Sequence, residues 1–289
     1  MSTLPSYALV ATPTSINENP RYRPPELAWR DLVPLNAWEK ALECSLSLPW
    51  LFLSCFAYYR LCHTGSVGWF VAGCVGSFFF FLTGLRQSHN AQHRCLGIGR
   101  RGHDVILFLL SVLMLASMHA VRVTHLHHHR HCLHDEDFEA AHANEPWWKV
   151  ILLGPLFVWR LHLFAWREGD ASCRRWIFSE LLAVAGVVIA TLVGLGGDWL
   201  RWHVTAMIVG ECCTAFFAVW IVHHGCEAHG QIARTQRGWL RNFLSYSMFY
   251  HLEHHLYPAV PTCHLPRLAE RLDRESPHYR RMQVIGLHS

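Results

Sequence analysis

Eight histidines occur in three short groups whose spacing places imidazoles on one face of a helix, because residues three or four positions apart are neighbours there. They are His89 and His93, then His125, His128 and His129, and finally His251, His254 and His255. Imidazole is the commonest metal ligand in proteins, and two histidines one turn apart offer two nitrogens to one ion without backbone strain. The three groups together predict a site that holds two metal ions.

The composition indicates that these histidines belong to a membrane protein. The chain has 289 residues, of which 52% are hydrophobic and 16% charged, so it is more apolar than an ordinary soluble domain. The net charge of +4 comes almost wholly from arginine, since Lys40 and Lys149 are the only lysines. Arginine beside apolar segments favours the inner side of a membrane and argues against a nucleic-acid partner. The eleven cysteines contain no Cys-x-x-Cys, so no disulfide framework is expected.

The first apolar stretches predict a transmembrane hairpin. Residues 41–62 and 67–85 are each close to the ~20 residues that cross a bilayer, and four residues connect them. Such a hairpin returns the chain to the side on which it started. The pair His89 and His93 follows within about one helical turn, so we expect it to lie at that face of the membrane.

The rest of the chain must bring the other two groups to the same face. Residues 104–121 are apolar, but a complete crossing would separate the first two groups, so we predict a re-entrant or interfacial segment. A polar, acidic loop follows the second group, and the aromatic residues of 146–166 favour an interfacial helix. Residues 177–195 and 204–222 predict a second hairpin. The expected fold is an all-α integral membrane protein with four transmembrane helices in two hairpins and a histidine-rich metal-binding cap on the cytosolic side.

The distribution of arginine predicts the orientation. The turns on the opposite side offer Arg60 and Arg201, whereas more arginines lie on the histidine side. The latter are Arg86, Arg94, Arg100, Arg101, Arg122, Arg130, Arg174 and Arg175. We therefore expect a multi-pass protein with both termini and the metal site on the cytoplasmic side. The expected organisation is an N-terminal tail with an interfacial helix (1–40), one membrane domain (41–275) and a C-terminal tail (276–289), without a cleaved signal peptide.

The three histidine groups, in this order and beside these hairpins, resemble the histidine boxes of the membrane fatty acid desaturase and hydroxylase superfamily. The resemblance includes YHLEHHLYPAVPTCHLP at 250–266 and covers residues 41–272, most of the chain. It is closest to bacterial desaturases, which implies the bacterial inner membrane. The first box departs from the usual pattern, because Asn90, Gln92 and Arg94 stand where an acidic residue and glycine are more common.

The resemblance implies two non-haem iron ions bound by the box histidines, with O2 as co-substrate. It implies an enzyme that removes hydrogen from an unactivated C–H bond and introduces a double bond into a fatty-acyl or other lipophilic chain. Membrane lipids would surround it, and electrons would come from an external donor such as a ferredoxin or a cytochrome. The resemblance implies no catalytic residue beyond the metal ligands.

Relatives often use a ninth histidine before the third box, and three residues compete for this role here: His223, His224 and His229. We favour His224, because it emerges directly from the last crossing and its His-Gly sequence is similar to the Glu-His-Gly of bacterial relatives; His229 is the second choice. Glu253 lies off the ligand face, so we expect it to orient a histidine. The intramembrane Glu211 either lines a substrate or proton path or is a neutral acid hydrogen-bonded to a neighbouring helix.

Other functions remain open at this stage. A hydroxylase or ketolase of the same superfamily, acting on a lipid, alkyl or carotenoid substrate, would need the same ligand spacing. A histidine-lined metal transporter would need ligands along a path through the membrane, whereas the boxes lie at the ends of the crossings. A membrane haem protein would need histidines facing one another inside the helix bundle. Residues 232–237 carry two arginines that would suit either an acidic electron donor or anionic lipid.

Overall fold

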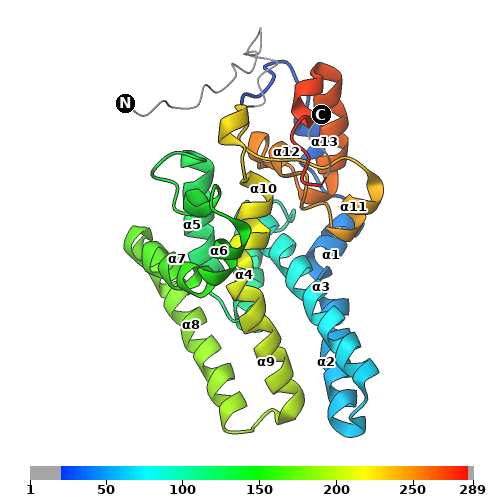
Figure 1. Cartoon of the computed structure of the whole chain (residues 1–289), viewed down its shortest axis with the longest axis vertical. Coiled ribbons are helices and arrows are strands. Elements are labelled where there is room, and N and C mark those ends of the chain that lie inside the picture. The colour runs from blue at the N-terminus through cyan, green and yellow to red at the C-terminus, as the bar shows by residue number, and fades with distance from the viewer. Residues whose placement is uncertain (1–20, 286–289) are drawn as a thin grey trace, which may run out of the picture.

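The computed structural model describes residues 21–285, and these residues form helices without a β-strand. One isolated bridge joins Thr235 to Gln283. Figure 1 shows two long helical hairpins, α2–α3 and α8–α9, that extend toward the same end, while α5, α12 and α13 lie toward the other end. The parts of the expected tails at 1–20 and 286–289 lie outside the described residues.

The first hairpin forms where the apolar stretches predicted it. α1 (Ala37–Ser45) begins at a capping box formed by Asn36 and Glu39, and it leads into α2 (Leu48–Thr64). Gly65 ends α2 with a φ of 63°, which a residue with a side chain rarely adopts. α3 (Val67–Gln92) then continues beyond residue 85 and carries His89 on its last turns. The helix itself therefore delivers the first box to the cap.

A sharp bend separates the next two helices. α4 (Arg100–Met114) and α5 (Met118–His131) meet at 111°, so this apolar segment does not cross the bilayer as one straight helix. Ser117 caps α5 at the bend. The buried carboxylate of Glu180 accepts hydrogen bonds from the Ser117 hydroxyl (2.5 Å) and from Nδ1 of His119 (2.6 Å). Because Glu180 comes from α8, the second hairpin holds the bend in place.

The second hairpin contains a broken helix. The connection before it contains η3 (Ala140–His142), α6 (Trp147–Leu152) and α7 (Gly154–Glu168). The hairpin itself consists of α8 (Ala171–Leu192) and α9 (Gly197–Cys212), and the π-helix η4 (Ala215–Trp220) and α10 (Ile221–His223) continue α9. The axis bends by 42° after α9. At this point α7 approaches α9 so closely that a Cβ on Gly154 would overlap the carbonyl oxygen of Cys212. Glycine is therefore required at residue 154.

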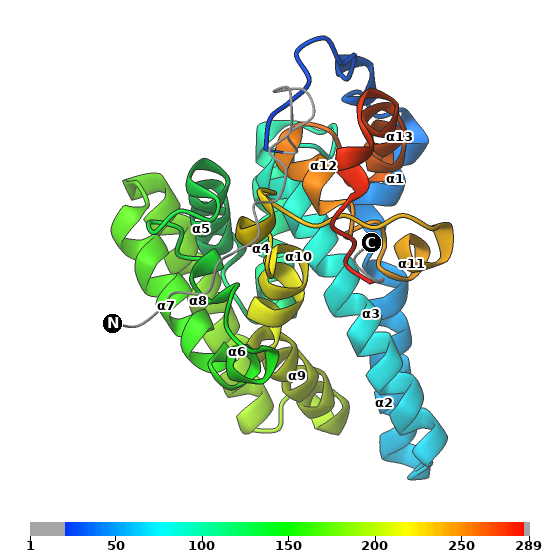
Figure 2. The ribbon, with the colours of Figure 1, turned by 45° about the horizontal axis from the view of Figure 1, so that its top comes forward.

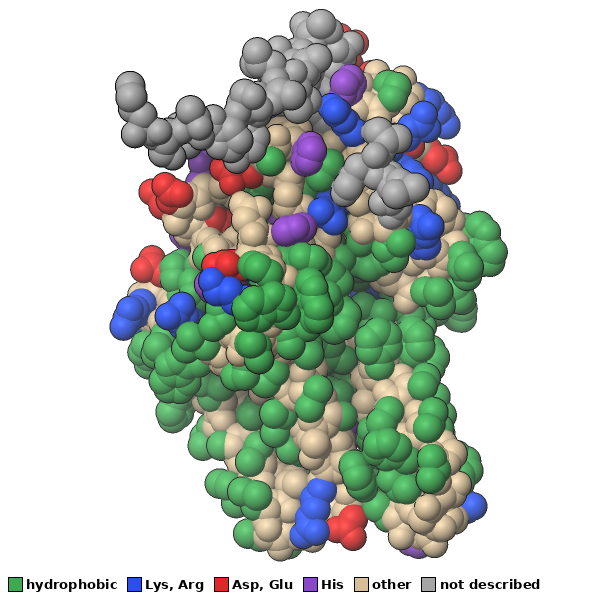
Figure 3. Space-filling model, in the orientation of Figure 1, with side chains coloured by type: hydrophobic (Ala, Val, Ile, Leu, Met, Phe, Trp, Pro, Cys, Tyr) green, Lys and Arg blue, Asp and Glu red, His purple; other side chains and the backbone are tan. Residues whose placement is uncertain are grey.

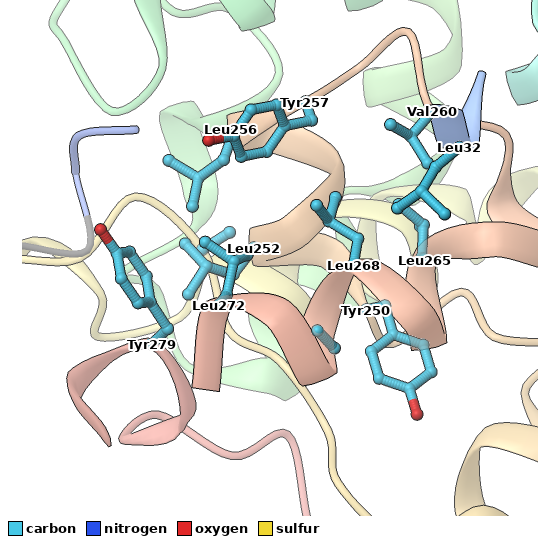
Figure 4. Packing of buried hydrophobic residues seen from close by; sticks show 12 residues of the cluster. Leu32, Tyr250, Leu252, Leu256, Tyr257, Val260, Leu265, Leu268, Leu272 and Tyr279 are labelled. Atoms are coloured by element: carbon cyan, nitrogen blue, oxygen red, sulfur yellow. The ribbon is translucent and has the colours of Figure 1, made fainter. Parts of the chain in front are cut away.

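The cap is held together by its own hydrophobic cluster. The elements of the cap are η2 (Arg30–Leu32), η5 (Glu227–His229), α11 (Trp239–Leu244), α12 (His251–Leu256), η6 (Thr262–His264), α13 (Leu265–Glu275) and η7 (Pro277–Arg280). Figure 4 shows Leu252 and Leu256 of α12 beside Leu268 and Leu272 of α13. The buried Tyr279 adds the chain beyond α13 to this cluster. The third box thus lies on a helix whose other side is anchored by leucines.

Several helices are long and apolar enough to cross a membrane. Three such stretches are residues 37–64, Val67–Gln92 and Ala171–Leu192, and there are up to five if each bent pair counts as one span. Figures 1 and 2 show α9 between α8 and the first hairpin. In Figure 3 hydrophobic side chains dominate the lower part of the molecule, and most of the charged and histidine side chains in view lie above them. This distribution is typical of a membrane protein with a polar cap.

Replacing Gly154 by alanine should destabilise the protein, because the new methyl group would meet the backbone of α9. Overpacking costs about 1–3 kcal/mol, which corresponds to a decrease in Tm of roughly 3–10 °C. Gly186→Ala is the matched control, since a Cβ at that helical position meets nothing within 4 Å. Thermal unfolding in detergent measures both variants. Equal Tm values would show that α7 and α9 do not approach as described.

Candidate metal centre

Nine histidines converge in the cap and form two adjoining groups. Site A consists of His89, His93, His125, His129 and His254. Site B consists of His128, His223, His251 and His255. In site A one ligand atom from each residue lies within 4.8 Å of the others. The eight box histidines therefore meet despite their separation in sequence, and His223 joins them.

The helical spacing divides each histidine triplet between the two sites. In α5, His125 and His129 face site A and their Nε2 atoms lie 3.2 Å apart, whereas His128 faces site B. In α12 the division is reversed, because His254 joins site A. The rings of His129 and His255 stack with centroids 4.3 Å apart, where the two sites adjoin. Residues at i and i+4 share a helix face and the residue at i+3 lies beside it, so each triplet serves both sites.

The nitrogens of site B are spaced as ligands of one ion. Its four Nε2 atoms form a ring whose consecutive separations are 3.1, 3.0, 3.2 and 3.3 Å, in the order 128, 223, 251 and 255. Two nitrogens that each lie roughly 2.1 Å from a metal ion are roughly 3.0 Å apart at a right angle and roughly 3.4 Å apart at the tetrahedral angle. Cys132 also lies near this group, but its Sγ is directed to the carbonyl oxygen of Ile232 at 3.6 Å.

Hydrogen bonds on the outer side determine which nitrogen faces the centre. Nδ1 of His128 lies 2.7 Å from a carboxylate oxygen of Asp137, and Nδ1 of His223 lies 2.8 Å from the carbonyl oxygen of Ile232. Both oxygens are acceptors, so each Nδ1 carries the proton and each Nε2 presents a lone pair to site B. Lone pairs that face one another at these distances repel unless a cation lies among them. The donor set of site B thus fits a metal ion.

Site A fits a metal ion for a related reason. Both ring nitrogens of His89 and Nε2 of His93 are buried without a hydrogen-bond partner. Buried polar atoms are normally satisfied, because an unpaired one costs free energy. A cation bound among these nitrogens would remove that cost.

Two carboxylates behind the second box orient its ligands. Asp137 and Glu139 come from the loop after α5 and lie against His128 and His125, with Glu139 3.3 Å from Nδ1 of His125. Burial works to raise the pKa of each carboxyl, but the hydrogen bonds that it accepts from its histidine and from neighbouring groups outweigh burial, so both pKa values lie below normal. Carboxylates behind metal-binding histidines hold the ring in place and raise its basicity. The acidic loop was visible in the sequence, although its role was not.

The first box is held by a polar network instead of an acidic residue next to its first histidine. Asn90 donates to Glu43 of α1 (2.8 Å) and accepts from the hydroxyl of Thr262 (2.7 Å). Glu43 also pairs with Arg86. Asn90 therefore ties the first box to α1 and to the segment that follows the third box.

The histidines of the third box remain neutral. Burial, followed by the charges of neighbouring imidazoles, lowers the pKa of His251, His254 and His255 well below the usual value for histidine. A neutral imidazole is the form that binds metal, because protonation occupies the lone pair. At physiological pH these three rings are ready to bind an ion.

The structure departs from the sequence-based preference for His224. Nδ1 of His224 lies 2.8 Å from the carbonyl oxygen of Ala143 and its ring stacks on Trp220, whereas His223 lies in site B. One residue rotates a helix by about 100°, so the two neighbours face different directions. His229 is exposed in η5.

The two carboxylates singled out in the sequence are both buried. Glu253 accepts a hydrogen bond from the Thr235 hydroxyl (2.7 Å) and pairs with Arg237 (2.8 Å), so these partners in the described structure are not histidines. It holds α12 against the segment that follows α10. Glu211 accepts from Thr214 at 3.5 Å, and its other carboxyl oxygen has no partner.

Comparison with known proteins identifies relatives of the chain. A family model described as fatty acid desaturase matches residues 64–285. A beta-carotene ketolase from Paracoccus sp. (strain N81106 / MBIC 01143) is 28% identical over 187 residues, 62% of this chain and 70% of that protein. A beta-carotene ketolase from Paracoccus sp. (strain PC1) is 26% identical over 238 residues, 78% of this chain and 90% of that protein.

We expect the His223→Ala variant to lose a metal ion that the His224→Ala variant retains, because His223 lies in site B and His224 does not. The purified wild type should contain about two metal ions per chain, and removal of one of four ligands should empty site B. Elemental analysis by mass spectrometry measures this content. If His224→Ala lost metal and His223→Ala did not, the assignment of site B would be wrong.

Asp137→Asn should weaken metal binding at site B by roughly 10- to 100-fold, the usual effect of removing a partner behind a ligand. The matched control is Asp135→Asn, an exposed position in the same loop. Competition with a graded series of chelators measures the affinity of both variants. Equal retention of metal would refute the role of Asp137.

Proposed function

Because the chain belongs to the fatty acid desaturase family, we propose that it is an O2-dependent oxidoreductase that attacks C–H bonds of a lipophilic chain with two non-haem iron ions. Site A and site B would hold the two ions through nine histidines. Neutral nitrogen ligands suit iron and leave its positive charge uncancelled. The bound ions would supply the activation of O2, while the protein holds the substrate and excludes water.

An apolar groove that reaches the metal centre carries this proposal. Two cavities of about 360 and 380 Å³ lie between α3 and the α9–η4 segment, and Phe78, Leu82, Leu85 and Phe217 line both. We call them together the lipid groove. Its far end reaches Trp202, and its near end reaches His251 of site B. A chain in the groove would therefore extend from the membrane interior to the metal centre.

The lining of the lipid groove indicates the class of substrate. Its walls are almost entirely hydrophobic, and among the lining residues Arg241 alone is charged, at the end that contains His251. A long hydrocarbon is the chemistry that such walls bind, because apolar walls offer few hydrogen bonds to a polar substrate. The groove thus supports a substrate that is drawn from the bilayer, with its reacting carbon next to site B.

Desaturation is the first candidate reaction. Two hydrogens leave adjacent carbons, and one O2 is reduced to two H2O with two electrons and two protons from outside the substrate. An external one-electron donor protein, such as a ferredoxin or a cytochrome, would supply the electrons.

Oxygen insertion is the second candidate, and the names of the two relatives favour it. Hydroxylation would consume one O2, two electrons and two protons, and would release one H2O. A ketone at the same methylene would need a second such insertion and the loss of one further H2O. Histidine geometry is common to both candidates, so the position of the substrate against site B must decide between them.

The proposed topology has four crossings, formed by α2, α3, α8 and the broken α9–η4 helix, with α4–α5 re-entrant. Both termini and the metal centre would face the cytoplasm of a bacterial inner membrane, because arginines accumulate on the histidine side. We propose that residues 41–275 form a single membrane domain.

Expression in a host that makes both fatty acids and carotenoids tests the reaction. We expect lipid mass spectrometry to find a product that depends on the nine histidines, with loss of two hydrogens for desaturation or gain of oxygen for insertion. Labelled O2 should enter the lipid only in the second case. A purified protein that contains zinc in place of iron, from cells that form no oxidised lipid, would contradict the proposal and favour metal transport.

Val209→Trp should block the lipid groove and reduce turnover at least tenfold, with its metal content unchanged. Ile208→Trp is the matched control, because residue 208 is about as exposed on the same helix but does not line the groove. Unchanged turnover of Val209→Trp would refute the groove as the substrate site.

A further inference from the structure

A further cavity lies against α5, on a face that does not carry the box histidines, and its lining is very different from that of the lipid groove. It measures about 470 Å³ and is lined by the four arginines 94, 100, 122 and 130 together with His119. We call it the arginine pocket. The metal ligands of α5 do not line it. Its chemistry is therefore separate from that of the metal centre.

His119 leaves one nitrogen open toward the arginine pocket. Its side chain is 3% exposed, and its Nδ1 donates to Glu180, so the proton is on that nitrogen. Nε2 has no hydrogen-bond partner and lies 3.6 Å from Asp104. The ring stacks on Trp176 with planes 2° apart, which fixes its direction. A buried nitrogen held in this way suits a hydrogen bond with a ligand hydroxyl group.

The positive charge of the arginine pocket is only partly compensated. Three carboxylates, Asp104, Glu168 and Asp170, also line it and face the four arginines. Asp170 caps the first turn of α8, and Asp104 lies 3.7 Å from Arg122. Within residues 21–285, no ion pair shorter than 4 Å joins Arg94, Arg100 or Arg130 to a carboxylate. Three guanidinium groups thus remain to bind an anion, and guanidinium groups match phosphate particularly well.

The position of the pocket favours a lipid as the source of that phosphate. It lies where α8, a helix long enough to cross the bilayer, begins at Ala171, and where α4 begins at Arg100. Val123, Leu126 and Trp176 give its lining an apolar part that suits the glycerol and upper acyl region of a lipid. Basic pockets between helices at the cytoplasmic face are sites for anionic head groups.

We propose that the arginine pocket binds the phosphate of an anionic phospholipid, with a head-group hydroxyl hydrogen-bonded to Nε2 of His119. The bound lipid would hold α4, α5 and α8 together at the membrane surface. Because α5 carries the second histidine box on another face, the lipid would also stabilise the helix that supports the metal centre.

The test compares the full-length protein in nanodiscs of phosphatidylcholine alone and with added phosphatidylglycerol. We expect phosphatidylglycerol to raise the Tm and to remain bound in native mass spectrometry. Neutralising an arginine near the membrane surface weakens such binding roughly fivefold, so Arg100→Gln combined with Arg130→Gln should weaken it roughly 25-fold. Arg100→Gln alone, at an exposed position, should give about the single-residue loss if the double variant does not fold.

The matched control is Arg101→Gln combined with Arg175→Gln, which removes two exposed arginines, one on α4 and one on α8, that do not line the pocket. This variant should bind phosphatidylglycerol like the wild type. Equal loss in both double variants would mean general surface attraction and would overturn the proposal. An equal Tm increase with inorganic phosphate would overturn the lipid assignment in favour of a small-anion site. If phosphatidylglycerol had no effect, the proposal would be overturned as well. An acidic protein that binds at this surface would then be the favoured alternative.

Discussion

The fold depends on keeping nine buried or half-buried imidazoles together with their nitrogens directed at one another. Buried polar groups without partners are costly, and here the rings of sites A and B crowd their lone pairs together. Asp137, Glu139 and the carbonyl oxygen of Ile232 hold three of these rings from behind. Such an arrangement is stable when cations occupy the centre, so the metal and the cap should support each other.

Each helix that carries a box serves two purposes. α12 presents histidines to the metal centre and leucines to α13, so the cap core determines where the third box lies. α5 presents His125, His128 and His129 on one face and lines the arginine pocket with another. The bend before α5 is fixed by Glu180 of α8, which also holds His119. The membrane helices and the metal centre are therefore mechanically connected through buried hydrogen bonds.

The broken helix after α9 connects the proposed substrate path to the metal centre. Phe217 of the π-helix lines both parts of the lipid groove, and His223 follows a few residues later in site B. A π-helix is a local departure from regular helical hydrogen bonding that often occurs at functional sites. Here it precedes His223 of site B, so the same stretch of backbone shapes the groove and sets the direction of His223.

The sequence by itself determined the helical class and the family, and it predicted that the eight box histidines would meet, because spacing of three and four residues defines a helix face wherever the helix lies. That residues 104–121 are re-entrant or interfacial stays a prediction; the structure shows a bend of 111° between α4 and α5. The sequence did not determine which histidine of each triplet belongs to site A and which to site B, since that depends on how α5 and α12 face each other. Nor did it decide between His223 and His224: a π-helix changes the rotation of the chain before them, and only the packed structure reveals that rotation. The lipid groove and the arginine pocket are likewise tertiary, because their walls come from segments that meet only after folding.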